Sequence, residues 1–272
     1  MTTDVRDLEI SLLLEAIYQR YHFDFRGYAR ASMRRRLERA LAILGCESLS
    51  QLQHRVLHEP DVFPTLLDTL TIGVTEMFRD PGYFLAVRRH VVPLLRTYPS
   101  LKLWVAGCST GEEVYSFAIL LREEGLLDRT LIYATDINAE ALRRAEQGVY
   151  SAQRLAAYSR SYVAAGGTGS LSDYYTAAYG AAALDRTLRR NVVFSDHSLA
   201  TDQVFAEVEM ISCRNVLIYF TPSLQDRATG IFADALVHHG VLGLGIKESL
   251  HATPRGAAFE DLVRDQRLYR RR

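Results

Sequence analysis

The feature that most constrains the fold is a pair of short apolar runs, each followed at once by a helical pattern. The first run, LKLWVAGC at 101–108, precedes a helical stretch at 112–124, and the second, TLIYATDI at 130–137, precedes one at 139–147. Short buried strands that alternate with helices are typical of βαβ units, whose strands form a parallel sheet. The alternation returns later in NVVFSDHSL, EVEMISCRNVLIYF, a helical stretch near 223–238, GVLGLGI and QRLYRRR. We therefore predict an α/β protein built around a parallel sheet.

Two segments depart from this alternation and divide the chain. From residue 8 to about 70 the apolar residues repeat at helical spacing, which predicts a helical domain with its linker over residues 1–80. The sheet domain is then expected over residues 81–272. Within it, residues 155–190 contain AAGGTGSLSDYY and are predicted to form an inserted hairpin or loop subdomain.

The overall composition argues against several classes of protein. The chain has 272 residues, and its 32 Lys and Arg balance its 32 Asp and Glu, so no net charge favours nucleic acid or an anionic membrane. No apolar run reaches the ~20 residues of a membrane helix, and the polar N-terminus MTTDVRDLEI does not resemble a signal peptide. Cys46, Cys108 and Cys213 share no metal-ligand spacing. We expect a cytoplasmic protein without a bound metal or direct membrane insertion.

The turn between the first strand and its helix, GCSTGEE at 107–113, admits three interpretations. Ser109 or Thr110 could cap the helix, with a glutamate three residues later in a capping box. A dinucleotide site would need a third glycine in GxGxxG, which this turn lacks. S-Adenosylmethionine carries a cationic amino group and a sulfonium instead of phosphates, so a carboxylate at this turn would attract it. Asp136, at the end of the next strand, would then bind the ribose hydroxyls, unless it only caps the helix that begins near Ala139.

Five motifs occur in the order typical of one enzyme family: TIGVTEMFRD, GCSTGEEVYS, ATDINAEAL, SCRNVLIYF and GLGIKESL. In this order they resemble the CheR-type chemoreceptor glutamate methyltransferases, and the similarity runs from the arginine-rich stretch near residue 30 to the C-terminal LYRRR. The resemblance implies an N-terminal helical domain and a Rossmann-like S-adenosylmethionine-dependent methyltransferase domain with a small inserted β-subdomain. It also implies a protein-glutamate O-methyltransferase, which forms glutamate methyl esters on chemotaxis receptors.

The resemblance assigns a set of residues to the cofactor. These are Thr75, Arg79, Glu113 for the methionine part, Asp136 for the ribose, Leu199 for the adenine, and Arg214 and Asn215 beside the cofactor. Two further cofactor-binding positions, Gly73 and Ser198, stand where the family often has asparagine, so each loses an amide hydrogen bond worth about 1 kcal/mol. This departure leaves a second hypothesis open, a regulatory module that binds S-adenosylmethionine or S-adenosylhomocysteine without turnover.

Two residues are expected to meet the substrate. The resemblance places Arg79 against the reacting carboxylate and makes Tyr219 the active-site tyrosine, although the apolar run around Tyr219 also fits a core aromatic. A glutamate side chain has a pKa of about 4.3 and is ionised at neutral pH, so its methylation needs no general base. The rigid fork of Arg79 would orient the carboxylate, and the Tyr219 hydroxyl would donate a hydrogen bond to it.

The arginine-rich stretch YARASMRRRLERALAILG is predicted to be a helix that ends at Gly45. It carries the predicted substrate-binding residues Arg30, Arg34, Arg35 and Arg39. Such a run often forms only a solvated face, but the resemblance implies glutamate-rich receptor methylation helices as the partner, which a basic face suits. Nucleic acid is disfavoured by the neutral total charge and by the lack of interleaved aromatics.

Two hypotheses stay open. The inserted subdomain could bind a C-terminal tether peptide of the receptor, as it does in some relatives. The methylated group could also be another carboxylate or a nucleic acid.

Overall fold

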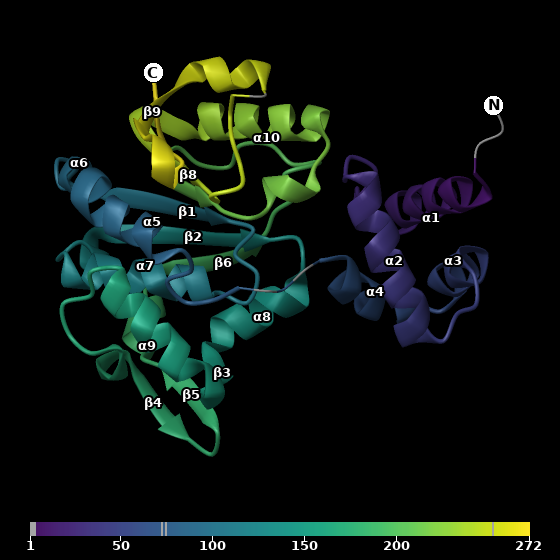
Figure 1. Ribbon diagram of the computed structural model, residues 1–272, viewed down its shortest axis with the longest axis horizontal. Coiled ribbons are helices and arrows are strands. Elements are labelled where there is room, and N and C mark those ends of the chain that lie inside the picture. Colours follow the sequence, from purple (N-terminus) through teal and green to yellow (C-terminus); the bar gives the residue numbers. More distant parts are fainter. Residues whose placement is uncertain (1–3, 72, 74, 252) are drawn as a thin grey trace.

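The N-terminal part of the chain is a group of helices joined by short turns (Figure 1). A computed structural model describes residues 4–71, 73, 75–251 and 253–272. The helices of this part are α1 Val5–Tyr21, α2 Arg30–Leu44, α3 Leu49–His58 and α4 Val62–Leu70. Their apolar faces share a core that contains Ile10, Leu37, Leu52 and Leu66. The predicted helical domain is confirmed, and α2 ends as expected at Gly45, whose φ of 65° lies in the left-handed region.

The larger domain is built around a mostly parallel sheet (Figure 1). Within the part of the chain that the structure describes, seven strands follow the order β6-β2-β1-β7-β8-β10-β9. Their bounds are β1 Leu101–Ala106, β2 Thr130–Asp136, β6 Val192–Asp196, β7 Val208–Cys213, β8 Leu236–Leu244, β9 Phe259–Val263 and β10 Leu268–Arg271. Strands β6, β2, β1, β7 and β8 are parallel, and β10 is antiparallel to β8 and β9. Because the chain order reverses at β1, a ligand crevice is expected at the carboxyl ends of β1, β2 and β7.

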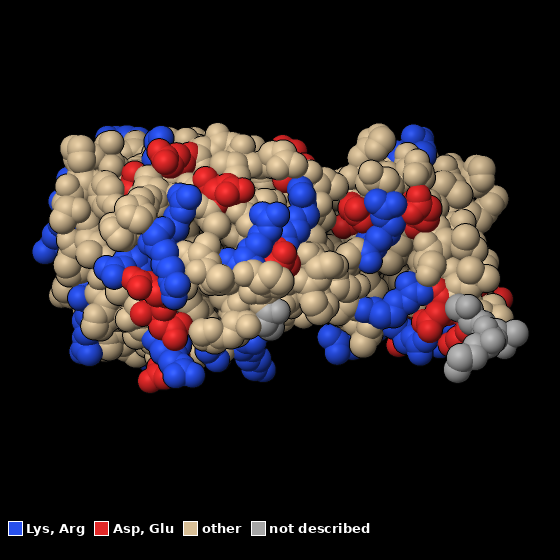
Figure 2. Space-filling view, turned by 90° about the horizontal axis from the view of Figure 1, so that it is seen from above, with Lys and Arg blue, Asp and Glu red and all other residues tan. Residues whose placement is uncertain are grey.

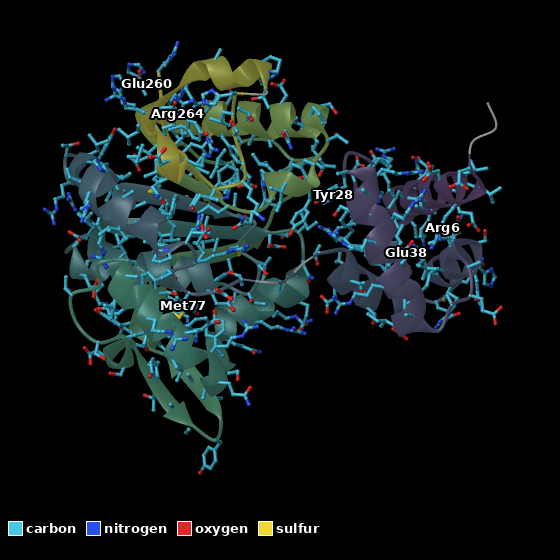
Figure 3. The ribbon with its side chains drawn as sticks, viewed as in Figure 1. Arg6, Tyr28, Glu38, Met77, Glu260 and Arg264 are labelled. Atoms are coloured by element: carbon cyan, nitrogen blue, oxygen red, sulfur yellow. The ribbon has the colours of Figure 1, made fainter. Side chains whose placement is uncertain are left out.

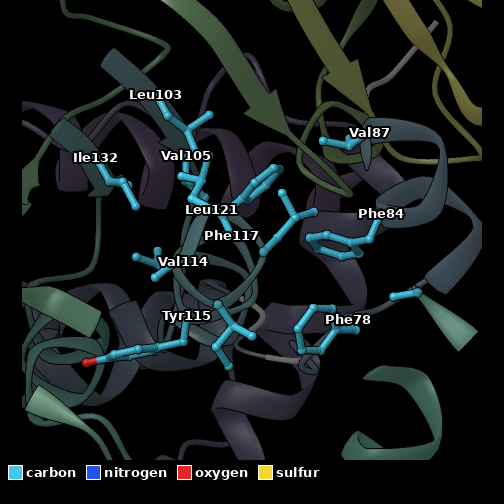
Figure 4. Close-up of a cluster of buried hydrophobic side chains, with 14 of the residues drawn as sticks. Phe78, Phe84, Val87, Leu103, Val105, Val114, Tyr115, Phe117, Leu121 and Ile132 are labelled. Atoms are coloured by element: carbon cyan, nitrogen blue, oxygen red, sulfur yellow. The ribbon is translucent and has the colours of Figure 1, made fainter. Parts of the chain in front are cut away.

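Alternate side chains of β1 pack into two separate hydrophobic cores. Val105 belongs to a core shared with Phe117 of α7 Glu112–Glu123, and the close-up shows this helix against the strands (Figure 4). Trp104 faces the other side and belongs to the core shared with α10 Pro222–Ala235. Strands covered on both faces are buried throughout, which explains why the apolar runs of the sequence are continuous.

A second, antiparallel sheet is inserted after α8 Ala139–Gln147 and lies apart from the main sheet (Figure 1). Its described strands are β3 Val149–Ser151, β4 Tyr175–Ala178 and β5 Ala181–Leu184, in the order β3-β5-β4. The β4–β5 hairpin lies inside the segment 155–190, but β3 precedes that segment and the helix α9 Leu155–Ala164 occupies its first part. The buried Tyr158 and Tyr162, four residues apart, are the helix signal that the glycine-rich sequence obscured.

The remaining elements are short. They are α5 Pro81–Ala86, η1 Val87–Val91, α6 Val92–Leu95, η2 Leu127–Arg129, η3 Ala152–Arg154, η4 Leu171–Tyr174, η5 Arg186–Arg189, η6 Leu217–Tyr219, η7 Pro254–Ala258 and η8 Arg264–Gln266. None of the helices formed by the described residues is both long enough and apolar enough to span a bilayer.

Hydrogen bonds between main-chain atoms join the two domains at Tyr28, which Figure 3 labels between them. Tyr28 forms an antiparallel bridge with Phe220, and the centres of their rings are 5.0 Å apart. The amide of Ala29 donates to the carbonyl of Tyr219 at 2.8 Å, and the amide of Thr221 donates to the carbonyl of Gly27 at 2.9 Å. The helical domain is therefore fixed directly to the segment that carries Tyr219.

Candidate active site

A pocket lies at the carboxyl ends of β1, β2 and β7 and extends to the helical domain. Most of the residues predicted for the cofactor and the substrate line it: Thr75, Arg79, Glu113, Asp136, Leu199, Arg214, Asn215 and Tyr219. Gly73 instead lines an adjoining groove between α4 and α8, which also reaches Asp136. Ser198 lies outside the wall of the pocket, one residue before Leu199, and its hydroxyl accepts a hydrogen bond from the amide of Ala200 at 3.3 Å.

The turn after β1 brings main chain close to the pocket. Gly107 has a φ of 71°, and a Cβ atom placed on it would lie 2.5 Å from Cγ2 of Val216. The N-cap of α7 is Gly111, without a capping side chain, so the alternative interpretation of a capping box at Ser109 or Thr110 is wrong. The hydroxyl of Ser109 is buried and has no partner among the described residues. The close approach packs this turn against the loop after β7, and the Ser109 hydroxyl is the group of the turn that could meet a bound cofactor.

Asp136 ends β2 in the pocket wall, with each carboxylate oxygen accepting an amide hydrogen bond. Oδ2 accepts from Ser109 at 2.8 Å and Oδ1 from Asn138 at 2.9 Å. Burial raises the pKa of the Asp136 carboxyl, and these amide hydrogen bonds oppose the rise. The N-cap of α8 is Asn138, whose side chain accepts from the amides of Glu140 and Ala141, so Asp136 does not cap that helix. A carboxylate has about four acceptor positions, so these amides leave capacity that a ribose hydroxyl could use.

The two glutamates of the turn point in different directions. Glu113 lines the pocket, where it accepts hydrogen bonds from Ser212 Oγ at 2.6 Å and from Arg214 Nη1 at 2.9 Å. Glu112 is buried outside the pocket and accepts a hydrogen bond from Thr110 Oγ1 at 2.7 Å. Burial raises the pKa of Glu112. Glu113 is therefore the carboxylate of the turn that can meet a cationic ligand group.

Arg214 organises one side of the pocket. Its Nη2 donates to the carbonyl of Arg79 at 2.7 Å and to Asp80 Oδ2 at 2.8 Å, while Nη1 holds Glu113. The guanidinium also lies 4.2 Å above the ring of Tyr83. Arg214 thus fixes both the expected cofactor carboxylate and the main chain of the predicted catalytic arginine.

Tyr219 is half-buried in the pocket wall, and its hydroxyl makes no hydrogen bond to the described residues. The loop before it has a strained residue, Asn215, with a φ of 61°. Glu248 holds this loop, because its carboxylate accepts from the amides of Asn215 at 2.9 Å, Ile218 at 3.3 Å and Gly245 at 2.6 Å. Burial raises the pKa of Glu248, and these amides oppose the rise. Glu248 belongs to the motif GLGIKESL, but the motif alone does not predict this supporting contact.

Arg36 was missed as a site residue. It is 4% exposed, lines the pocket from α2, and its guanidinium lies 4.2 Å above the ring of Tyr219. Its Nη1 donates to the carbonyl of Leu70, but Nε and Nη2 are buried without a partner among the described residues. Burial lowers the pKa of Arg36. The available signal was its position on the apolar face of α2, three residues after Met33 and one before Leu37.

The predicted substrate-binding arginines of α2 fall into two pairs. Arg30 and Arg34 form ion pairs with Asp7 at 3.5 and 2.8 Å, so α1 already compensates their charge. Arg35 and Arg39 are exposed and have no ion-pair partner in the described part of the chain, and Arg39 lines the groove next to the pocket. On the face seen in Figure 2, basic and acidic side chains mostly lie beside one another.

Comparison with known proteins covers both domains. The family described as "CheR methyltransferase, all-alpha domain" matches residues 8–71, and the family described as "CheR methyltransferase, SAM binding domain" matches residues 73–262. A Pseudomonas putida protein named "Putative methyltransferase Cher3" is 59% identical over 265 residues, which cover 97% of each chain. The "Chemotaxis protein methyltransferase 2" of Pseudomonas aeruginosa is 32% identical over 80% of this chain and 78% of its own. The "Chemotaxis protein methyltransferase" of Salmonella typhimurium is 28% identical over 95% of this chain and 86% of its own.

Proposed function

Because this chain belongs to the CheR methyltransferase family and has its S-adenosylmethionine-binding domain, we propose that it methylates glutamate side chains of chemotaxis receptors. The product would be a glutamate methyl ester. The printed names of the relatives from P. aeruginosa and S. typhimurium support a place in chemotaxis.

The observation that carries this proposal is the buried guanidinium of Arg36. A buried cation with two nitrogens that find no partner among the described residues is unfavourable until an anion reaches it. It lines the same pocket as Arg79 and Tyr219, so a carboxylate that enters there would meet two arginines and a free hydroxyl. A lysine side chain would be repelled, and a neutral nucleobase would leave the cation unpaired.

In this proposal, different residues of the pocket have different roles in methyl transfer. Glu113, Asp136 and Leu199 would hold S-adenosylmethionine, which supplies an electrophilic methyl group on a sulfonium when bound. Arg79 and Arg36 would orient the incoming carboxylate, and Tyr219 would donate a hydrogen bond to one of its oxygens. The carboxylate is already ionised, so no residue has to remove a proton. Walls from both domains would limit the access of water to the bound reactants, and water would otherwise stabilise the separated charges.

Chemoreceptor methylation helices are the partner that we propose for the exposed face of α2. Arg35 and Arg39 carry uncompensated charge, and Arg39 lies beside the groove that leads to Asp136 and Gly73. A helix rich in glutamates would be attracted to this face and could present one side chain to the pocket.

Transfer of a labelled methyl group to receptor-containing membranes tests the proposal. A glutamate methyl ester releases labelled methanol in mild alkali, whereas methylated amines and bases do not. Tyr219→Phe is the matched variant, because it keeps the ring under Arg36 and removes only the hydroxyl. We expect unchanged affinity for S-adenosylhomocysteine and a loss of ester formation of ~10-fold or more. Cofactor binding without any labelled product would favour the regulatory module, and an alkali-stable product would favour another substrate.

A further inference from the structure

A second pocket lies beside the edge strand β6. It is lined by Arg186, Thr187, Arg189 and Arg190 from η5 and its end, by Val192 and Phe194 of β6, and by Glu146 of α8. About 420 Å³ of open space lies between these side chains, within the range of small-molecule sites. It shares no lining residue with the candidate active site.

The turn that presents the arginines is anchored to the core domain. η5 is a 3₁₀ turn with three residues per turn, so Arg186 and Arg189 project to the same side. Asp185 caps the turn by accepting from the amide of Thr187 at 2.9 Å. Arg122 from the end of α7 donates to Asp185 at 3.2 Å and to Thr187 Oγ1 at 2.5 Å. The main chain that carries the arginines is thus held in place before any ligand arrives.

The three arginines of this pocket form no ion pair in the described part of the chain, and they outnumber Glu146, the carboxylate that lines the pocket with them. No described carboxylate lies within ion-pair distance of Arg186, Arg189 or Arg190, since Asp185 pairs with Arg122 and Glu146 stays beyond 4.0 Å. By contrast, the exposed Arg143 and Arg144 of α8 both pair with Glu140. Three neighbouring guanidinium groups repel one another, and a multivalent anion between them would remove that repulsion.

We propose that this pocket binds a small molecule that carries phosphate. Guanidinium groups match phosphate oxygens in geometry and charge, and three of them can share a diphosphate. Val192 and Phe194 offer an apolar wall to an attached organic group. The site is a hollow bounded by few residues and not an extended basic stripe, which favours a small ligand over an acidic protein segment.

Calorimetry with inorganic pyrophosphate and with ADP tests this site. The protein is first saturated with S-adenosylhomocysteine so that ADP cannot enter the adenosine pocket, and ionic strength is held constant with NaCl. We expect saturable one-to-one binding of both probes, with ADP tighter because its organic part reaches Phe194. The double variant Arg186→Gln/Arg190→Gln should weaken both by at least ~10-fold. Arg143→Gln/Arg160→Gln removes the same charge outside the pocket and should leave both affinities unchanged.

Equal weakening in the two double variants would overturn the proposal, because it would show general attraction to surface charge. Absence of saturable binding of both probes would also overturn it, as would binding of a glutamate-rich peptide in their place. If the double variant lowers the melting temperature, Arg190→Gln alone serves, because that side chain is exposed. Receptor methylation should be the same in the variants and the wild type, so failure here does not affect the proposed methyl transfer.

Discussion

At the scale of single residues, the pocket contains ionisable groups whose pKa values are shifted by burial. Arg36 is a cation without a carboxylate partner in the part of the chain that the structure describes, and Asp136 is a carboxyl whose pKa burial raises. Sequence motifs located Asp136 because it ends a strand of the parallel sheet. They did not locate Arg36, because its role depends on how the helical domain is placed against Tyr219, and no local pattern encodes that placement.

Replacing Arg36 with methionine should separate stability from activity. Methionine fills a similar volume and removes an unpaired buried charge, so we expect the melting temperature to stay the same or rise. Ester formation should fall ~10-fold or more if the guanidinium binds the substrate carboxylate. Thermal unfolding and the labelled-methyl assay measure the two effects. Wild-type turnover in Arg36→Met would remove this residue from the site.

Acidification should weaken binding of S-adenosylhomocysteine. The ribose hydroxyls need the ionised form of Asp136. Because the pKa of Asp136 is raised above its ordinary value of 3.8, affinity should begin to fall at a higher pH than it would with an ordinary aspartate. Folding of the free protein responds with the opposite sign: a raised pKa stabilises the folded state at low pH, and this contribution disappears as pH rises through the folded pKa. Asp136→Asn, compared by calorimetry and thermal unfolding, should lack both trends. A wild-type affinity profile in that variant would contradict the assignment.

At the scale of elements, the strands and their main helices followed from the sequence, whereas several connections did not. The predicted helix at 139–147 agrees with α8, because Asn138 caps it and Gly148 ends it. The helix predicted near 223–238 ends earlier, at Ala235, since β8 begins with Leu236 in the main sheet. Strand β9 was missed because it pairs only with β10, and its sequence has no strong alternation. The end of α10 and the presence of β9 thus depend on strand pairing between segments that are distant in the sequence.

The loop that carries Tyr219 should depend on Glu248. In Glu248→Gln, an amide nitrogen replaces one of the oxygens that accept from the amides of the loop, which costs about 1–3 kcal/mol for a buried group. We expect a lower melting temperature and slower methyl transfer. Glu260→Gln is the matched control, because that glutamate is half-buried and, among the described residues, forms an ion pair with Arg270 alone. Equal behaviour of the two variants would show that Glu248 does not position the loop.

The basic face of α2 should act through its two uncompensated arginines. Arg35→Glu/Arg39→Glu should weaken receptor methylation more than Arg30→Glu/Arg34→Glu does after correction for stability, because Asp7 already compensates the second pair. Added salt should weaken wild-type methylation, since charges are screened over ~8–10 Å near physiological ionic strength. Affinity for S-adenosylhomocysteine should not change in either variant. Normal methylation by the Arg35/Arg39 variant would leave α2 as a solvated face.

At the scale of the whole molecule, two domains with separate cores share one pocket. Tyr28, Arg36, Leu70 and Thr71 line it from the helical side, and the carboxyl ends of the strands line it from the other. Both domains, and most of the residues proposed for the cofactor that line the pocket, could be predicted from the sequence. The sequence could not predict that the first domain completes the site, because each domain satisfies its own hydrophobic pattern alone.

The main-chain bridge between Tyr28 and Phe220 has a thermodynamic consequence. A ligand that touches both walls of the pocket binds only while the bridge is closed, so its free energy of binding adds to the work of separating the domains. Hydrogen exchange should report this linkage. S-Adenosylhomocysteine should slow exchange of the Ala29 and Thr221 amides, which cross the interface, while amides at the exposed tip of the β4–β5 hairpin keep their rates. The degree to which the cofactor slows this exchange would therefore report how often the two domains separate.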